Sequence, residues 1–347
     1  MKAYVLKEIN QLEYAEVPLP QLKPGEVLVE VKAAGICGSD IPRIFETGTY
    51  HFPTIPGHEF SGVVREVYDK SLEGWLEKKV GVFPLIPCKK CEQCKNMQYE
   101  MCTQYDYLGS RRDGGFAEYV AVPAWNLIAL PHEVGFEEAA MLEPASVGIH
   151  ALKRVDLTKV QSVAVIGTGT IGVIISQWLR ILGVKELFLI GTNENQRSLV
   201  EKLGFTHFCN RHVKDVTEYI AEMSGERGVD LAVECAGYSQ VLEDCLKIVK
   251  PGGEVLVVGN PHGNLELPKE IYWKLLRKQI RICGTWNSSY VPEASEDDWR
   301  LTLEKIVEGK LQLQRQITHR IPFDRLPEGL EVMRTKKEFY NKIMIVR

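Results

Sequence analysis

The stretch Ser162-Val-Ala-Val-Ile166-Gly167-Thr168-Gly169-Thr170-Ile171-Gly172 decides the fold of the central part of the chain. A short apolar run leads into G-x-G-x-x-G, and a helix-length segment follows. Glycines at these positions permit a tight turn, let the backbone approach a pyrophosphate and allow close helix–strand packing. Free N–H groups at the start of the helix attract phosphate. The pattern therefore predicts a dinucleotide site formed by Gly167, Gly169, Thr170, Ile171 and Gly172.

The alternation of strand and helix continues beyond this loop. Nearly continuous apolar runs recur between helix-length segments, at Val163–Ile166, Leu187–Ile190, Val229–Val233, Val255–Val258 and Ile280–Cys283. This alternation predicts an α/β domain with a doubly wound parallel sheet, a Rossmann domain, over residues 150–285. Ligands bind at the carboxyl ends of parallel strands, so we expect Cys235 and Val258 to line the cofactor cleft.

The end of the second predicted strand lacks the acidic residue that accepts the ribose 2′-hydroxyl in NAD-binding proteins. Gly191-Thr192-Asn193 stands there instead. Without a carboxylate, a 2′-phosphate meets no repulsion, and Thr192, Asn193 and the nearby cations Arg197 and Arg211 favour NADP. The alternative is that Glu194 or a backbone group holds the ribose of NAD, so both cofactors stay open.

Both flanks of this region are rich in short strands. Residues 1–149 alternate apolar and polar side chains between Pro and Gly turns, as in Glu26–Lys32 and Phe116–Val122, which is typical of antiparallel β structure. Residues 286–347 close with a strand at Lys342–Val346. We therefore expect one β-rich domain from residues 1–149 and 286–347, with the dinucleotide-binding domain inserted into it.

A second motif lies in the first flank, where Cys37-Gly-Ser-Asp40 precedes Pro56-Gly-His58-Glu59. Thiolate and imidazole together suit zinc, and a catalytic zinc takes three protein ligands and leaves one position open. Cys37 and His58 are the first two candidates, and the third is either Glu59 or the distant Glu143. Asp40 or Glu59 would fix the tautomer of the histidine. The alternative is a buried thiol near an unrelated surface histidine.

Four cysteines form a third motif with the spacing C-x2-C-x2-C-x7-C, namely Cys88, Cys91, Cys94 and Cys102. Four thiolates on one ion leave no position for water, so the spacing predicts a structural zinc site in a lobe of residues 85–104. The flanking residues are polar, and metal binding would supply on the order of ten kcal/mol of the lobe's folding free energy. An iron–sulfur cluster is the rival occupant.

The composition narrows the class of protein. The chain has 347 residues, a formal net charge of −4 and 45% apolar residues, which is typical of a soluble protein with about two domains. Balanced charge argues against a nucleic-acid or membrane partner, and we find no signal or membrane-spanning segment. Nine cysteines in such a chain indicate metal ligands and inert buried thiols in a reducing cytoplasm, the buried ones being Cys209, Cys235, Cys245 and Cys283.

Two metal motifs and a dinucleotide loop in this order resemble the medium-chain zinc alcohol dehydrogenases over essentially the whole chain. The polyol branch of that family is resembled at Gly35–Asp40, Pro56–Glu59 and Glu143–His150. Four segments of the chain resemble dehydrogenases of sugar-alcohol phosphates, namely Cys37–Phe45, Tyr107–Tyr119, Leu276–Lys278 and Gly284–Trp286. The resemblance implies a GroES-like fold for the β-rich catalytic domain, two zinc ions per chain, NAD or NADP, and a homodimer or homotetramer.

The resemblance also implies roles for individual residues. Cys37, His58 and Glu143 would hold the catalytic zinc, and Glu59 would lie beside it or exchange with Glu143. Ser39 would pass the substrate proton outward, although a hydroxyl at this position could equally cap a turn.

A phosphorylated substrate requires a cation, and a guanidinium matches phosphate in a bidentate way. Arg43, Arg111 and Arg112 are the candidates, and solvated ion pairs are their alternative role. Further candidates for the substrate cleft are Tyr50, His51 and Trp286, of which the two aromatic residues could equally be core or rim side chains.

The leading hypothesis is a zinc-dependent dehydrogenase of a sugar-alcohol phosphate. The first alternative is a dehydrogenase of an unphosphorylated polyol or another secondary alcohol, such as sorbitol or threonine. The second alternative is a nucleotide-binding protein without alcohol chemistry, which would keep only the four-cysteine zinc as a brace.

Overall fold

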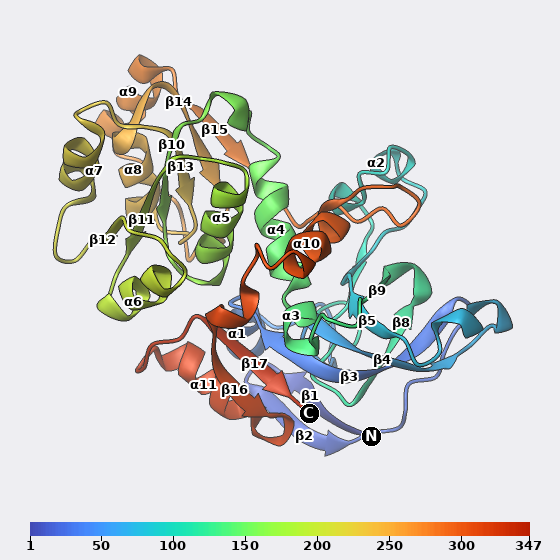
Figure 1. Ribbon diagram of the computed structural model, residues 1–347. Coiled ribbons are helices and arrows are strands. Elements are labelled where there is room, and N and C mark those ends of the chain that lie inside the picture. The colour runs from blue at the N-terminus through green and yellow to red at the C-terminus, as the bar shows by residue number, and fades with distance from the viewer. The chain divides into compact units, whose positions relative to one another are not determined.

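The computed structural model describes all 347 residues, and the chain folds into two compact units (Figure 1). The first unit comprises Met1–Glu143, Ser289–Gly309 and Leu313–Arg347, and the second comprises Pro144–Ser288 with Lys310–Gln312. The boundaries that we expect for the dinucleotide-binding domain, at residues 149/150 and 285/286, stay a prediction. None of the helices combines the length and apolarity that a bilayer crossing requires.

Six parallel strands form the sheet of the second unit. They are β10 (Ser162–Ile166), β11 (Glu186–Gly191), β12 (Phe208–Asn210), β13 (Val229–Glu234), β14 (Val249–Val257) and β15 (Arg281–Gly284). The spatial order is β12-β11-β10-β13-β14-β15. Counted from β10, this is the 3-2-1-4-5-6 order of doubly wound dinucleotide-binding sheets. The expected α/β class with a Rossmann-like sheet is confirmed.

Helices cover both faces of this sheet. They are α5 (Thr170–Ile181), α6 (Glu194–Lys202), α7 (Val216–Ser224), α8 (Ser239–Ile248) and α9 (Lys269–Lys278), with α4 (Leu142–Leu152) preceding the first strand. One core joins Phe188 and Ala232 of the sheet to Tyr219, Cys245 and Ile271 of α7, α8 and α9. Helix α5 contacts β10 and β11 but contributes nothing to that core, so it lies on the opposite face. Burial on both faces explains the continuous apolar runs.

The first unit is built on a mixed sheet of order β16-β17-β3-β4-β5-β9, with β8 also paired to β3. Its strands are β1 (Lys2–Glu8), β2 (Gln11–Glu16), β3 (Glu26–Ile36), β4 (Glu59–Val67), β5 (Lys79–Val82), β6 (Leu85–Ile86), β7 (Asp106–Tyr107), β8 (Tyr119–Pro123), β9 (Leu127–Ala129), β16 (Ile317–Pro322) and β17 (Lys342–Val346). Its α-helices are α1 (Asp40–Phe45), α2 (Glu92–Lys95), α3 (Phe136–Ala140), α10 (Asp298–Val307) and α11 (Leu326–Thr335). The last strand pairs antiparallel with β3. Residues from both ends of the chain therefore share one sheet.

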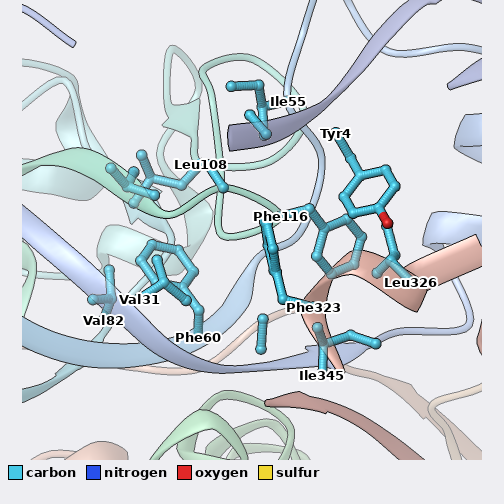
Figure 2. Close-up of a cluster of buried hydrophobic side chains, with 14 of the residues drawn as sticks. Tyr4, Val31, Ile55, Phe60, Val82, Leu108, Phe116, Phe323, Leu326 and Ile345 are labelled. Atoms are coloured by element: carbon cyan, nitrogen blue, oxygen red, sulfur yellow. The ribbon is translucent and has the colours of Figure 1, made fainter. Parts of the chain in front are cut away.

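Figure 2 shows the core beneath this sheet. Val31 of β3 and Ile345 of β17 are buried in the same cluster as Phe116. Tyr4 packs against Phe323, with ring centroids 5.7 Å apart, and burial raises the pKa of Tyr4 to about 12. Apolar burial at roughly 25 cal/mol per Å² is thus what joins the first and last segments of the chain.

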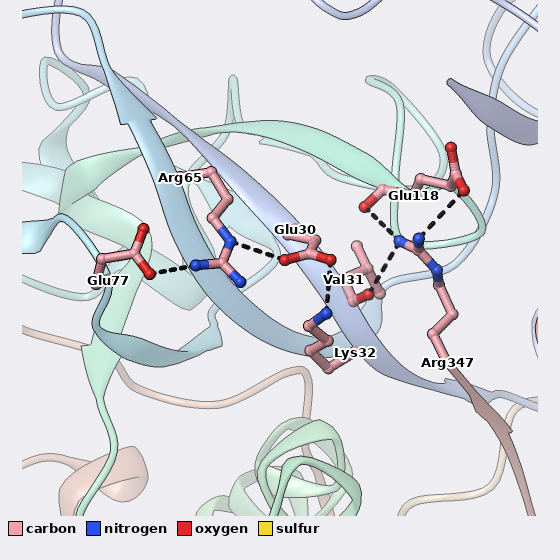
Figure 3. Close-up of polar contacts among 7 residues, drawn as sticks. All are labelled: Glu30, Val31, Lys32, Arg65, Glu77, Glu118 and Arg347. Atoms are coloured by element: carbon pink, nitrogen blue, oxygen red, sulfur yellow. Dashed lines mark hydrogen bonds and ion pairs between the residues drawn. The ribbon is translucent and has the colours of Figure 1, made fainter.

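Charged side chains gather on strands of the same sheet (Figure 3). Glu30 of β3 pairs with Arg65 of β4 at 2.7 Å and with Lys32 at 2.5 Å. Burial would raise the pKa of Glu30, but the two cations lower it below its usual value. Arg347 reaches Glu118 at 3.1 Å. Exposed pairs of this kind contribute about 0–1 kcal/mol each, so the apolar core carries most of the stability.

Two details of the expected pattern are wrong. The strand predicted from Phe116 begins only at Tyr119, because the Phe116 N–H donates to the Pro56 carbonyl at 3.0 Å and its ring packs at Gly57. Cys235 and Cys283 were both expected to be buried, but both are partly exposed: Cys235 lies just beyond the end of β13, and Cys283 lies on β15, the edge strand of its sheet. The sequence pattern also did not indicate β12, α7 or α9, which are short or largely polar.

Asp230 of β13 fixes the start of β10. It accepts hydrogen bonds from the backbone N–H groups of Gln161 and Ser162 at 2.9 Å each, and pairs with Lys250. Burial would raise the pKa of Asp230, but these partners lower it to about 2.

We expect Asp230→Asn to lower the free energy of unfolding by about 2 kcal/mol at pH 7. The folded-state pKa lies below the unfolded value of about 3.9, so the contribution is present above about pH 4 and is lost as the pH falls towards 2. Urea unfolding at pH 7 and pH 3 measures it, with the surface variant Glu13→Gln as control. A difference from the unmodified protein that is the same at both pH values would contradict this assignment.

Candidate functional site

Cys37, His58 and Glu59 converge where β3 ends and β4 begins. The two strands pair antiparallel with Gly35 opposite Glu59, so the thiol that follows β3 comes close to the residues that open β4. One ligand atom from each of the three lies within 4.8 Å of the other two, and His58 and Glu59 are buried. A sulfur, a nitrogen and an oxygen donor at this separation fit a zinc ion with one position left open.

Asp40 lies behind this group, fully buried at the start of α1. Its Oδ1 is 3.3 Å from His58 Nδ1, and its Oδ2 accepts the backbone N–H of Cys37 at 2.9 Å. This contact leaves Nε2 of His58 as the metal-binding nitrogen. Burial lowers the pKa of His58, but the charges of Asp40 and Cys37 raise it well above its usual value. The pocket therefore favours a cation.

Glu59 is held by a buried ion pair with Lys342 of β17, whose Nζ also donates to the Ile36 carbonyl at 3.0 Å. A Cβ at position 35 would lie 2.3 Å from Glu59 Oε2 and 2.6 Å from Lys342 Cε, so only glycine fits at Gly35. Lys342 was not predicted as a site residue. A lysine opening an otherwise apolar strand is the signal that could have indicated it.

Glu143, on α4, is buried beside the three-residue group but is not part of it. The Tyr107 hydroxyl donates to Glu143 Oε1 at 3.4 Å. Burial raises the pKa of Glu143 to about 7; the charge of Glu59 also raises it, and His58 and Lys342 oppose the rise. Of the two carboxylates considered as the third ligand, the geometry brings Glu59 into the group and leaves Glu143 adjacent.

Ser39 and Arg43 line the same group. Ser39 Oγ is 3.4 Å from Cys37 Sγ and accepts a hydrogen bond from Arg43 Nη1 at 3.1 Å. The same nitrogen lies 4.0 Å from Asp40 Oδ1. A guanidinium only donates, so Arg43 cannot receive a proton from Ser39. An outward relay through Ser39 therefore requires a water or a substrate group as its next member.

The other substrate candidates lie in three different settings. Tyr50 is largely exposed, and its ring stacks on Arg111. His51 Nε2 lies 3.0 Å from the Arg111 carbonyl oxygen. Arg112 is committed to the buried Glu26 at 2.6 Å, which matches its alternative role in an ion pair. Trp286, half exposed, belongs to the second unit.

The four-cysteine lobe has the dimensions of a single-ion site. The sulfur atoms are 3.9 Å apart for Cys88–Cys94 and for Cys91–Cys102. Tetrahedral zinc with Zn–S bonds of about 2.3 Å requires sulfur separations of about 3.8 Å. Sulfurs this close enclose one ion and leave no room for a multi-iron cluster. Backbone N–H groups lower the pKa of Cys91 to about 6, which favours its thiolate.

The glycine loop lies between β10 and the N-terminus of α5, as predicted. Gly167 has a φ of 107°, which favours glycine. A Cβ on Gly172 would lie 1.9 Å from the Gly167 carbonyl oxygen, so this glycine lets the helix approach the strand. A Cβ on Gly169 would meet nothing within 4 Å. Space over Gly169, at the start of α5, is what a bound pyrophosphate requires.

Two further turns meet this loop at the carboxyl ends of β13 and β14. The Cys235 backbone lies 3.1 Å from where a Gly167 Cβ would be, and the Val258 N–H donates to the Glu234 carbonyl at 2.9 Å. Buried Glu234 accepts the N–H groups of Ala236 and Gly237 at 2.7 Å each. Glu234, which we did not predict, positions the turn at Cys235. An acid ending a buried strand is the signal for it.

The ribose end of the site excludes an acid at position 191. A Cβ on Gly191 would lie 2.5 Å from Gln196 Oε1 and 2.6 Å from Thr168 Oγ1. Gln196 Oε1 accepts the Thr192 N–H at 2.7 Å, and Asn193 caps α6 by accepting the Gln196 N–H at 3.0 Å. The Gln196 side chain thus occupies the space that the usual carboxylate would need.

Both cations expected here are already paired. Arg197 bonds Glu194 at 2.5 Å, and Arg211 bonds the buried Asp244 at 2.9 Å. Glu194 also accepts from Asn210 at 3.0 Å, so each of its oxygens has a partner. The structure thus leaves Thr192, Asn193 and the outer edge of Arg197 as the groups nearest a 2′-substituent.

Comparison with known proteins places these sites in a family. The Alcohol dehydrogenase GroES-like domain matches residues 23–132, and the Zinc-binding dehydrogenase domain matches residues 170–308. Galactitol 1-phosphate 5-dehydrogenase of Escherichia coli (strain K12) is 33% identical over 331 residues, covering 95% of each chain. The chain belongs to the medium-chain zinc alcohol dehydrogenase family.

Other members of the zinc alcohol dehydrogenase family are similar over the full length. The crystal structure of galactitol-1-phosphate dehydrogenase from Escherichia coli superposes with a TM-score of 0.90 at 32% identity, covering 100% of both chains. Sorbitol dehydrogenase of Bacillus subtilis (strain 168) is 28% identical and covers 99% of this chain and 97% of its own. Polyol dehydrogenases with and without a phosphate in their substrate are thus both relatives.

The variants Gly169→Ala and Gly172→Ala distinguish a glycine that leaves space for the dinucleotide from a glycine that is needed for helix–strand packing. We expect Gly169→Ala to leave the free energy of unfolding within about 0.5 kcal/mol while raising the dissociation constant of the dinucleotide at least about tenfold. Gly172→Ala should reduce both stability and binding, because its methyl group meets the Gly167 carbonyl. Thermal unfolding and cofactor fluorescence titration measure the two effects. Unchanged affinity in Gly169→Ala would exclude this loop as the pyrophosphate site.

Single Cys→Ser variants test the two metal sites. Cys88→Ser should lose one zinc per chain and lower the thermal stability, because the lobe folds around its ion. Cys37→Ser should lose a different zinc together with the dehydrogenase activity. Metal analysis of the purified proteins measures both, with Cys245→Ser as a control that keeps two ions. One zinc in the unmodified protein, confined to residues 88–102, would favour a nucleotide-binding protein without alcohol chemistry.

Proposed function

We propose that this enzyme oxidises a sugar-alcohol phosphate, galactitol 1-phosphate to tagatose 6-phosphate, with transfer of a hydride to NADP or NAD. The observation that carries the proposal is Arg43, whose guanidinium is bonded to Ser39 beside the Cys37 thiol. A cation at the reaction site suits an anionic substrate. The 33% identity with a galactitol 1-phosphate 5-dehydrogenase supports the same substrate class.

The residues of the site allow each step of the proposed oxidation to be assigned to a particular group. A zinc ion would supply Lewis-acid chemistry to the alcohol oxygen, and a nicotinamide would accept the hydride. Cys37, His58 and Glu59 would hold the metal, with Asp40 keeping the proton on His58 Nδ1. Ser39 Oγ has one lone pair engaged by Arg43 and a second free to accept a hydrogen bond from the substrate hydroxyl. It would take that proton only while passing its own O–H proton to a water molecule. The products are a ketone, the reduced cofactor and one proton.

We further propose that the enzyme accepts NADP. The absence of an acid at Gly191, and the lack of space for one there, support this. A candidate zinc-binding dehydrogenase from Sinorhizobium meliloti 1021, 27% identical with a TM-score of 0.88, was solved bound to NADP. Arg197 and Arg211 are both paired with acids, so they are less available to a 2′-phosphate, and we expect only a modest preference for NADP over NAD. NAD held through Glu194 is the alternative.

Two alternatives for the substrate remain specific enough to test. Other relatives are named sorbitol dehydrogenase and L-threonine 3-dehydrogenase, so an unphosphorylated polyol and threonine are the two alternative substrates. Neither would explain a cation beside Ser39. A cytoplasmic location, inferred from the cysteine content, and a homodimer or homotetramer, inferred from the family, are further proposals.

Initial rates across a substrate panel test the proposal. We expect kcat/KM for galactitol 1-phosphate to exceed that for sorbitol and for threonine by at least about 100-fold, the value of two charge-assisted hydrogen bonds. Each substrate is measured with NAD and with NADP at the same pH. Faster turnover of sorbitol would contradict the proposal of a phosphorylated substrate. A preference for NAD of more than about tenfold would contradict the NADP proposal.

A further inference from the structure

Arg111 is a guanidinium clamped between two aromatic rings. Its Cζ lies 4.0 Å from the ring centroid of Tyr50 and 4.4 Å from that of Tyr105. Its Nη1 donates to the Tyr105 carbonyl at 3.1 Å, and its buried Nε has no hydrogen-bond partner. Two rings at this distance hold a planar cation flat by cation–π attraction. The clamp fixes the plane of the guanidinium and leaves part of its hydrogen-bonding capacity unused.

The backbone of Arg111 is bonded to Tyr107, whose side chain reaches the metal-binding group. Its N–H donates to the Tyr107 carbonyl at 2.9 Å, and its carbonyl oxygen lies 3.0 Å from His51 Nε2. Tyr107 in turn bonds Glu143, and its ring centroid is 5.9 Å from that of His58. Tyr107 thus links the segment that carries the clamp to the metal-binding group.

Arg111 carries a charge that no carboxylate of the protein pairs with, and Arg43 has only a long contact with one. Arg111 has no ion pair with a carboxylate in the structure, whereas the adjacent Arg112 bonds Glu26 at 2.6 Å. The nearest carboxylate to Arg43 is 4.0 Å away on Asp40, which is engaged with His58. A hydrogen bond to Arg111 lowers the pKa of Tyr50, burial opposes this, and the charge of Arg43 adds to it.

The Tyr50 ring therefore lies against one cation, Arg111, and its hydroxyl is affected by the charge of a second, Arg43. Because two guanidinium groups act on the Tyr50 hydroxyl, a negative charge is stabilised near that oxygen. A phosphate monoester carries close to two negative charges at pH 7. Arg111 and Arg43 together match that charge.

We infer that Arg111, held between Tyr50 and Tyr105, is the specificity-determining residue that binds the phosphate of the substrate, with Arg43 as the second cation. This assignment rests on the proposed function, since it concerns a phosphorylated polyol in the same site. The carbon to be oxidised lies at Cys37, His58 and Glu59, and the phosphate end of the polyol lies at the clamp. Arg112, the other arginine of the pair, has no part in binding.

The decisive experiment compares Arg111→Ala with the unmodified enzyme on galactitol 1-phosphate and on sorbitol. We expect kcat/KM for galactitol 1-phosphate to fall about 30-fold, the loss of a charge-assisted hydrogen bond, and mainly through KM because the phosphate is bound equally in ground and transition states. The rate with sorbitol should stay within about twofold. Arg111→Lys, which keeps the charge but not the planar fork, should recover only part of the loss.

A matched control is Arg277→Ala, which removes an arginine stacked on Trp273 at 4.7 Å in the other unit and should change neither substrate. Tyr50→Phe keeps the ring and tests the hydroxyl alone, with a smaller expected loss. Inorganic phosphate should compete with the substrate, and its inhibition constant should rise in Arg111→Ala. Retained circular dichroism and zinc content show that each variant is folded.

The outcomes separate the two proposals. If the unmodified enzyme prefers sorbitol, the proposed substrate is overturned and the phosphate assignment falls with it. If the unmodified enzyme prefers galactitol 1-phosphate but Arg111→Ala retains its KM, only the assignment of Arg111 is overturned. An equal loss on both substrates in a folded variant also overturns it, because a phosphate-binding residue cannot affect a substrate without phosphate. Arg43→Ala then tests the second cation in the same way.

Discussion

The buried ion pair between Lys342 and Glu59 is the contact on which the catalytic half of the chain depends. It joins the last strand to the residues that open β4, beneath a glycine at position 35 that leaves room for both side chains. Removing either partner of such a pair leaves an uncompensated buried charge, which typically costs about 3–5 kcal/mol. The pair also gives the return of the chain to the first unit a role, because Lys342 of the closing strand holds the Glu59 carboxylate of the metal-binding group.

Around this pair the charges are arranged in two layers. The inner layer is acidic, with Asp40, Glu59 and Glu143 buried around the Cys37 thiol and His58. Lys342 offsets one of these carboxylates, and a divalent cation would offset the others. The outer layer is basic: Arg43 bonds Ser39 beside the Cys37 thiol, and the proposed phosphate site adds Arg111 to it. Under the proposed function, a substrate with a hydroxyl at one end and an anion at the other would satisfy both layers in a single orientation.

Local patterns in the sequence predicted the parts that local chemistry determines. The glycine loop, the four-cysteine spacing, the α/β alternation and the closing strand Lys342–Val346 each follow from neighbouring residues, and the structure has them where expected. Roles that depend on distant partners were not predictable. Lys342 meets Glu59 across 283 positions, and Asp230 fixes the start of β10 from 68 positions away. Arg111 and Arg112 are adjacent and identical in type, yet Tyr50 and Glu26 give them different environments.

The packing at Gly191 has a consequence for how cofactor use can change over time. Thr168 and Gln196 fill the space in which a carboxylate would have to stand, and Gln196 also secures the turn that begins α6. A single replacement of the glycine by aspartate would therefore collide with its neighbours before it could help NAD. An engineer would combine that replacement with a change at Thr168 or Gln196, so cofactor use changes here by a coupled step.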